Sequence, residues 1–353
     1  MALMVLVLFS CGGDGKSGKQ GGKSLFTPVS SGHPYEMLVV IDKGLWERPA
    51  GRALFNALDM DVPGLPQPER SFRISNIGPD KFDRGFRKFR NIIDVDIQPI
   101  YTQPKLKYSR DSYASPQMIM TIQAPDEQSF EEFVDKNKQV IVDFFTKAEM
   151  NRQISLLKKK HSDLISTKIG SMFGCDVWVP VELERYKQGT DFLWASSDNN
   201  ASDVSMNFVI YSYPYTDKDT FTKDYFVHKR DSVMKINIPG SREGQYIQTD
   251  ADYVNVKNFS VKGEYAFEAR GLWYMENDMM GGPFVSHARV DRPNGRVVVV
   301  EAFIYAPEKK KRDLMRKMEA SLYTLNLPQE QELEEIVVGV ELEEDKQSAP
   351  AQE

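Results

Sequence analysis

Short apolar runs and amphipathic stretches alternate through the first half of the chain. Apolar or alternating runs predict strands, because successive side chains on a strand point to opposite faces. The predicted strands lie at residues 36–42, 72–77, 92–97 and 118–122. A helix is predicted over residues 45–58, and the prolines within residues 62–68 prevent its continuation. Phe82, Phe86 and Phe89 share one face of a further helical stretch.

The longest helix is predicted to run from Asp126 to about residue 165. Asp126 is suited to cap the first turn, and the basic run 158–160 lies near the end, where the helix dipole favours cations. The apolar stripe consists of Phe130, Phe133, Val134, Val140, Ile141, Phe144, Phe145, Ala148, Ile154 and Leu157. We expect this helix to close a first domain and to connect it to a second one.

The second half of the chain again contains predicted strands and helices in succession, but its sequence does not repeat that of the first half. The predicted strands lie at residues 173–180, 192–195, 205–211, 266–275, 282–290 and 296–306. A helix is predicted over residues 221–236 and stops before Pro239 and Gly240. Asn294 and Gly295 form the strongest short hairpin signal. A last helix opens at Pro307, a residue favoured at the first helical position.

This order of elements predicts an α+β fold with two α/β-sandwich-like domains, mainly antiparallel sheets and a long connecting helix. A chain of 353 residues also suits two domains. The predicted segments are a signal peptide at 1–10, a flexible tether at 11–33, an N-terminal α+β domain at 34–165, a C-terminal α+β domain at 166–327 and an acidic disordered tail at 328–353.

The N-terminal end is typical of a bacterial lipoprotein signal. An apolar run over residues 1–9 ends in Ser10 and Cys11, and a Gly/Ser/Lys-rich stretch follows. We expect cleavage before Cys11 and acylation of its new N-terminus, which would anchor the protein to a membrane. Gly12, rather than Asp, favours the outer membrane, facing either the periplasm or the outside. The run lacks a basic residue, so two alternatives stay open: a start other than Met1, and a buried N-terminal strand with Cys11 as a core thiol.

Composition narrows the class of protein. The net charge of −6 argues against a nucleic-acid partner, whose protein surfaces are normally basic. No second apolar stretch approaches the length of a membrane span. Once Cys11 is lipidated only Cys175 remains, so no internal disulfide is expected and stability must come from core packing.

Three stretches of sequence resemble a family known as domain of unknown function 4837, lipoproteins of Bacteroidetes. They lie at residues 62–69, 90–93 and 270–287, and the last, from Arg270 to His287, is the most distinctive. The resemblance covers residues 35–325 and agrees with the lipoprotein signal. Because the family has no assigned activity, the resemblance implies a location and no mechanism.

No motif names a reaction. Cys175 with His161, His228 or His287 is one thiol-nucleophile hypothesis, but Cys175 lies in a predicted strand, where a free cysteine is usually a small apolar residue. The histidines are isolated, and no His-x-x-x-His, Cys-x-x-Cys or calcium-loop spacing is present. Phosphate-loop and Gly-x-Ser-x-Gly motifs are also absent, and the Gly-x-Gly-x-x-Gly spacing at residues 13–18 lies in the predicted tether, without a predicted strand before it or a predicted helix after it. We therefore expect no metal, no cofactor and no catalytic residue identifiable from the sequence.

One segment is a candidate binding loop, because aromatic residues and methionines surround acidic residues there and these types are enriched at binding surfaces. Its residues are Trp273, Tyr274, Glu276, Asp278, Met279, Met280 and Phe284. The competing interpretation is an ordinary hairpin, with a turn at residues 281–283 that uses the conformational freedom of glycine.

The sequence thus favours a non-catalytic, lipid-anchored envelope protein that binds a partner protein or a glycan. The alternative is an envelope hydrolase that acts on glycan or peptide through carboxylates paired only in space. A deep pocket with facing acidic groups would favour the hydrolase, and a shallow apolar patch near Trp273 would favour binding.

Overall fold

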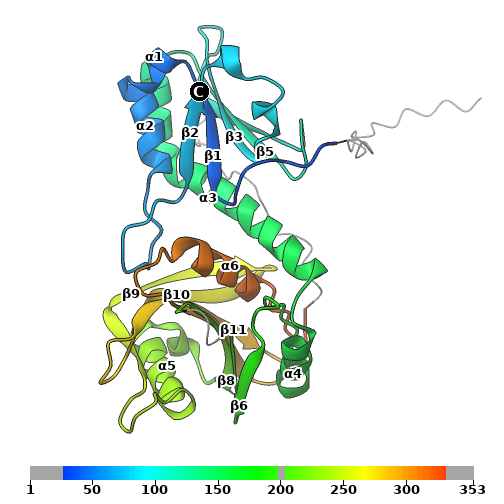
Figure 1. Cartoon of the computed structure of the whole chain (residues 1–353), viewed down its shortest axis with the longest axis vertical. Helices are drawn as coiled ribbons and strands as arrows, with labels where there is room; N and C mark the ends of the chain where they lie inside the picture. The colour runs from blue at the N-terminus through cyan, green and yellow to red at the C-terminus, as the bar shows by residue number, and fades with distance from the viewer. Residues whose placement is uncertain (1–26, 198–202, 331–353) are drawn as a thin grey trace, which may run out of the picture.

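The computed structural model describes residues 27–197 and 203–330. Cys11, Gly12 and residues 331–353 of the predicted acidic tail lie outside the described residues. Residues 328–330, also assigned to the disordered tail from sequence, are described, and Glu330 accepts hydrogen bonds from Arg289 and from the backbone of Leu327. Two domains, each with one β-sheet, are stacked along the long axis, and a long helix crosses from the first to the second (Figure 1). The expected α+β class with two domains is confirmed.

The N-terminal domain is built on a five-stranded sheet of order β2-β1-β3-β5-β4. Its strands are β1 (Glu36–Val40), β2 (Arg73–Ile77), β3 (Asn91–Ile97), β4 (Lys105–Arg110) and β5 (Met118–Ala124). Strands β2, β1, β3 and β5 run parallel, and only β4 pairs antiparallel, with β5. The expectation of mainly antiparallel sheets therefore fails in this domain, whose sheet is mixed: crossover connections bring β1, β2, β3 and β5 into the same direction, and only β4 runs the other way.

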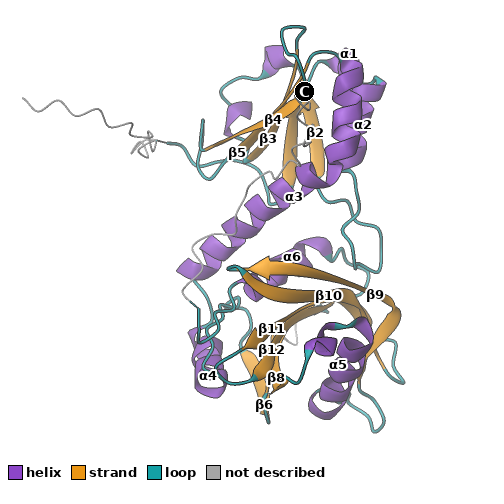
Figure 2. Ribbon diagram, turned by 180° about the vertical axis from the view of Figure 1, so that it is seen from behind, coloured by secondary structure: helices purple, strands orange, loops and turns teal. Residues whose placement is uncertain are grey.

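The short helices of this domain are α1 (Lys43–Trp46), α2 (Pro49–Leu58) and the 3-10 helices η1 (Pro79–Lys81) and η2 (Phe86–Lys88). The single helix predicted over residues 45–58 is split, because Asp42 caps α1 and Pro49 begins α2. Helix α2 and the long helix cover one face of the sheet (Figure 2). Phe82 and Phe89 pack on the other face.

The long helix α3 (Glu127–Lys159) has 33 residues and begins at the predicted cap, Asp126. It ends six residues before the predicted end, because the backbone N–H of Ser162 donates to the carbonyl of Val179 rather than continuing the helix. Helix α4 (Asp163–Phe173) follows. The first part of α3 packs in the N-terminal core, whereas Met150, Ile154 and Leu157 pack against Ala320 of the C-terminal domain.

The C-terminal domain contains a seven-stranded sheet of order β6-β7-β8-β12-β11-β10-β9, antiparallel throughout, as expected. Its strands are β6 (Arg185–Gly189), β7 (Phe192–Ser196), β8 (Ser205–Pro214), β9 (Ile247–Val261), β10 (Glu264–Met275), β11 (Gly281–Asp291) and β12 (Arg296–Tyr305). Its other helices are η3 (Lys218–Phe221), α5 (Lys223–Asn237) and α6 (Arg312–Tyr323).

Helices cover both faces of this sheet. Val298 and Val300 of β12 face α4 and α6, whereas Val297 and Val299 face α5, as the two-residue period of a strand requires. Helix α6 therefore lies between the sheet and the N-terminal domain (Figures 1 and 2). None of the helices in residues 27–197 and 203–330 combines the length and apolarity needed to span a bilayer.

Two local expectations change. Residues 173–180 do not form the predicted strand. Phe173 ends α4, and Gly174 follows it in the left-handed conformation, with φ 63°. Asp176 then forms an isolated β-bridge with Asn326. Residues 29–31, assigned to the tether from sequence, form backbone hydrogen bonds with Ser115 and Lys88. The described part of the chain is therefore attached to the N-terminal domain before residue 33.

Candidate functional site

The candidate binding loop of the sequence is divided by the structure. Trp273 and Phe284 belong to the core beneath α5, and Trp273 is only 2% exposed. The Trp273 ring meets Phe303 edge-on at 5.4 Å, and its indole N–H donates to the carbonyl of Ile304. These two residues stabilise the fold, as the hairpin interpretation holds, and offer no surface to a ligand.

The remaining residues of the loop form a turn. The carboxylate of Asp278 accepts hydrogen bonds from the backbone of Met279 and from the side chain of Gln245. Tyr274 donates to Gln248, Glu276 is half-buried, and Met280 packs against the core. Only Met279 projects completely, with its side chain 100% exposed. A single methionine does not make a patch, so this loop is not the strongest site of the molecule.

The cysteine–histidine hypothesis finds no geometric support. Cys175 is 3% exposed and donates weakly to the carbonyl of Phe173. Burial raises the pKa of its thiol to about 12, so the thiolate that a nucleophile needs is disfavoured. His161 stacks on Trp178, His287 contacts Glu268, and His228 is exposed on α5. No group of three or more metal-ligating side chains occurs within residues 27–197 and 203–330.

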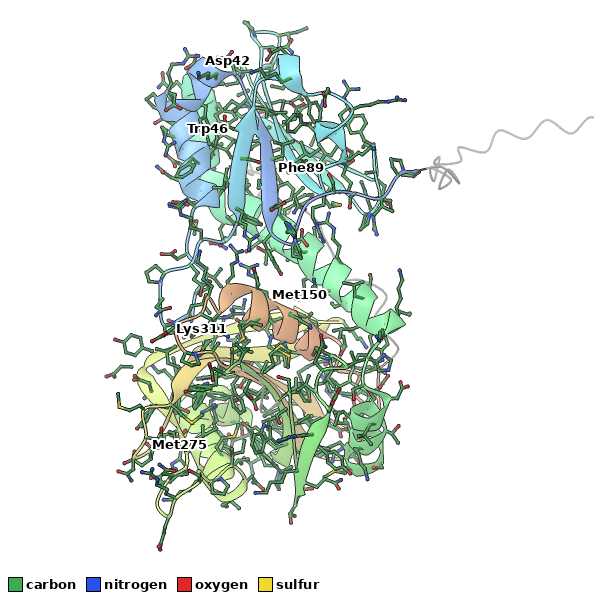
Figure 3. The ribbon with its side chains drawn as sticks, viewed as in Figure 1. Asp42, Trp46, Phe89, Met150, Met275 and Lys311 are labelled. Atoms are coloured by element: carbon green, nitrogen blue, oxygen red, sulfur yellow. The ribbon has the colours of Figure 1, made fainter. Side chains whose placement is uncertain are left out.

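A cleft of about 1060 Å³ lies between the two domains. On the N-terminal side it is lined by the loop that follows α2 and by one face of α3, from Gln139 to Met150. On the C-terminal side it is lined by β9, β10 and α6. Figure 3 shows Met150 on the side of α3 that faces α6. Neither domain forms this cleft alone.

A charged network holds the C-terminal wall of the cleft. Arg270 donates to Glu268 at 2.8 Å and to Glu319 at 2.6 Å, so one guanidinium bridges the two carboxylates. Lys257 lies 3.2 Å from Glu268 on the exposed side, and His287 lies 3.3 Å from it on the buried side. Burial alone would raise the pKa of Glu268, but the hydrogen bond with His287 and the charge of Arg270 lower it well below its usual value.

Arg316, one turn after the start of α6, also lines the cleft, but it differs from Arg270. It is 5% exposed, and its guanidinium lies over the ring of Tyr35, 4.4 Å from the centroid. Within the described part of the chain, its Nε and Nη1 have no hydrogen-bond partner. The same holds for the hydroxyl of Thr146, a cleft residue on α3. The hydroxyl of Tyr35 lies within reach of Arg316, but not at hydrogen-bond geometry.

Tyr35 is itself unusual. It precedes β1 with a φ of 61°, a conformation that costs a residue with a bulky side chain on the order of 1 kcal/mol or more. It is 2% exposed, and burial raises the pKa of its phenol to about 12, with the charge of Arg316 opposing the rise. The phenol therefore keeps its proton at neutral pH and can donate a hydrogen bond.

The domains are joined beside the cleft by a helix cap supplied across the interface. Lys311 is the N-cap residue of helix α6, and its side chain makes no capping hydrogen bond. The carboxylate of Glu69 accepts hydrogen bonds from the backbone N–H groups of Lys311 at 2.6 Å and Arg312 at 3.2 Å. Arg312 in turn donates to the carbonyl of Arg70 at 2.7 Å. Figure 3 places Lys311 where the N-terminal domain's loop reaches α6.

Sequence reasoning missed Arg316, Tyr35 and the carboxylate pair around Arg270. One signal was present: Arg312, Arg316 and Glu319 recur at four- and three-residue spacing, as a buried helix face does. Charged residues at such spacing are ordinarily taken as a solvated face. Only the packing of a second domain turns this face into an interface.

Comparison with known families divides the chain at the same place as the structure. Residues 162–324 match the family described as Domain of unknown function (DUF4837). This half of the chain belongs to the DUF4837 family. Residues 30–158 match a second family, described as Domain of unknown function (DUF8532). No curated protein matches the sequence.

The DUF4837 domain thus contains the whole seven-stranded sheet with α4, α5 and α6. The stretch 270–287, on which the resemblance mainly rests, forms the end of β10, the turn and half of β11. The stretches 62–69 and 90–93 instead fall within the DUF8532 match. The cleft therefore lies between the domain that matches DUF8532 and the domain that matches DUF4837.

Proposed function

We propose that this protein is a lipid-anchored cell-envelope protein that binds a small ligand between its two domains. The cleft of about 1060 Å³ carries this proposal. Ligand sites prefer domain interfaces, and their volumes are roughly 300–1,000 Å³. The walls combine apolar residues such as Val142 and Phe259 with charged side chains such as Arg316, and polar groups of this kind orient a small molecule.

The carboxylates in the cleft favour binding over hydrolysis. A hydrolase that uses two carboxylates needs one with a raised pKa to act as an acid. Glu268 and Glu319 are instead both bound by Arg270, and the pKa of Glu268 is lowered. Arg270 therefore fixes both carboxylates in the wall of the cleft, and Glu268, with its lowered pKa, stays ionised at neutral pH and has no proton to donate.

The anchor is proposed from the sequence around Cys11. Acylation there, followed by a Gly/Ser/Lys-rich linker, would hold the DUF8532 domain near the membrane. Gly12 favours the outer membrane as the destination. A ligand from the cell envelope fits this location better than a nucleic acid, given the net charge of −6.

A cleft-filling variant tests the binding proposal. Ser260 is exposed on β9 and lines the cleft, so Ser260→Trp is expected to fill the entrance without disturbing the core. Asp252→Trp places the same side chain on an exposed β9 position that does not line the cleft. The small-molecule fraction of a cell-envelope extract should raise the Tm of the native protein and of Asp252→Trp. An equal rise with Ser260→Trp, or no rise with the native protein, would refute binding in the cleft.

A further inference from the structure

Four buried polar atoms without a partner are concentrated where the two domains meet. They are the Thr146 hydroxyl, Nε and Nη1 of Arg316, and the Tyr35 hydroxyl, which lies within reach of Arg316 but not at hydrogen-bond geometry, counted within residues 27–197 and 203–330. A buried donor or acceptor left unpaired costs about 1–3 kcal/mol, so such groups are rare and call for an explanation. Arg316 and Thr146 line the cleft from its two sides, and Tyr35 lies beneath the guanidinium.

Among the described residues, no carboxylate forms an ion pair with Arg316. Glu319, on the next turn of α6, is bound to Arg270. Glu149, which influences the same tyrosine, accepts hydrogen bonds from Arg90, Asn91 and Arg152. Burying a cation without a counter-charge costs several kcal/mol. A negatively charged ligand group would therefore gain more binding free energy beside Arg316 than beside an exposed arginine.

We propose that the cleft binds the anionic group of its ligand, a carboxylate or a phosphate, through the guanidinium of Arg316 with the hydroxyls of Tyr35 and Thr146. This inference rests on the proposed ligand binding in the cleft and adds the chemical class of the ligand. All three side chains can donate to an anion, because guanidinium has only donors and both hydroxyls are protonated. Guanidinium binds oxyanions through paired hydrogen bonds, which also fixes their orientation.

The surroundings allow an anion to enter. Lining the cleft are five cationic side chains and four carboxylates, and two of the carboxylates are neutralised by Arg270. The left-handed backbone of Tyr35 fixes the position of its ring under Arg316. Strained residues of this kind concentrate at ligand sites, where the surrounding structure holds them in place. The rest of the ligand would face the apolar wall that includes Phe259 and Val256.

Titration with two minimal anions tests the proposal on the full-length purified protein. Inorganic phosphate and acetate are each compared with chloride at equal ionic strength, and Tm is followed as a function of concentration. We expect a saturable rise in Tm with at least one of the two oxyanions. Saturation with phosphate alone indicates a phosphate ligand, and saturation with acetate, with or without phosphate, indicates a carboxylate. No saturable rise above chloride with either anion overturns the proposal.

Variants assign the effect to these residues. Arg316→Lys should weaken the anion roughly 10- to 100-fold, the equivalent of one charged hydrogen bond. Tyr35→Phe and Thr146→Val keep the side-chain volume and should each weaken it by about 2- to 10-fold. Arg292→Met, at a position 69% exposed and paired with Glu264, is the control and should bind as the native protein does. Unchanged affinity in both hydroxyl variants would overturn the proposal even if the Arg316 variant fails to fold.

The two proposals fail separately. If Ser260→Trp abolishes the response to envelope extract while phosphate and acetate have no effect, the cleft binds a ligand and only the anionic class is wrong. If the anions bind but Ser260→Trp leaves the extract response unchanged, the anion site exists and the envelope ligand lies elsewhere. Loss of both responses in the native protein refutes both.

Discussion

At the scale of single residues, the space around a residue decides its role, even where the residue type suggests a different role. Gly281 and Gly282 attract attention as turn residues, yet neither has a positive φ; Asn277, with φ 56°, makes the turn. Both glycines lie in β11, where a side chain would collide with neighbouring backbone. An added Cβ on Gly281 would lie 2.9 Å from the carbonyl of Trp273, and one on Gly282 would clash with the carbonyl of Ile304. Glycine is required here for space.

We therefore predict that Gly282→Ala lowers the free energy of unfolding by about 1–3 kcal/mol through overpacking. Gly170 is the control: it lies in α4, and an added Cβ would meet nothing nearer than 3.8 Å. Gly170→Ala should raise the stability by about 0.5–1 kcal/mol, because alanine loses less backbone freedom in a helix. Denaturant unfolding of both variants measures this. Equal stability of Gly282→Ala and the native protein would show that the sheet relaxes around the new methyl group.

At the scale of elements, helix α6 depends on the other domain. Its first N–H groups bond to Glu69, and its last two turns pack against Met150 and Ile154 of α3. The helix also carries Arg316 and Glu319, so its position sets the geometry of the cleft. An element of the C-terminal domain is thus held at both ends by the N-terminal domain.

Replacing the cap should weaken this junction. Glu69→Ala leaves two buried backbone N–H groups without an acceptor, so we predict a loss of about 1.5–3 kcal/mol in the free energy of unfolding. Arg73→Ala removes an exposed ion pair with Asp313 at the same interface and should cost less than about 1 kcal/mol. Denaturant unfolding of both proteins makes the comparison. Similar losses in the two variants would mean that Glu69 acts only as a surface charge.

At the scale of the whole molecule, the fold and the proposed lipid anchor depend on different parts of the chain. The main cores of the two domains, one cluster in the N-terminal domain and two in the C-terminal domain, are made of residues between Tyr35 and Leu327, well away from Cys11 in the sequence. Acyl chains would contribute binding to the bilayer, at about 0.8 kcal/mol for each buried CH₂, and nothing to either core. Membrane attachment and ligand binding can therefore vary independently.

Cys11→Ser tests the anchor in the native host. We expect metabolic labelling with a palmitate analogue for the native protein and none for Cys11→Ser, with loss of acyl-mediated attachment. The Tm of the described domains should not change, because neither core includes the substituted position. Native protein that takes up no label would remove the anchor from the proposed function.

The sequence by itself determined most elements, because each depends on a local period or a local signal. The apolar stripe and Asp126 predicted α3, and the hairpin signal at Asn294 and Gly295 lies between β11 and β12 as expected. The same reasoning missed β9, whose exposed edge position leaves it without an apolar alternation. It also gave one helix where Pro49 separates two.

Tertiary structure alone decided which strands pair and which distant side chains meet. The parallel order of the first sheet depends on how the crossovers wind, which no local period encodes. Whether charged residues on α6 face water or a cleft depends on a domain packed against them. Tyr35 and Arg316 come from opposite ends of the chain and meet only when both domains are in place. Local patterns therefore specify the elements, and the free energy of burial between distant segments specifies the site.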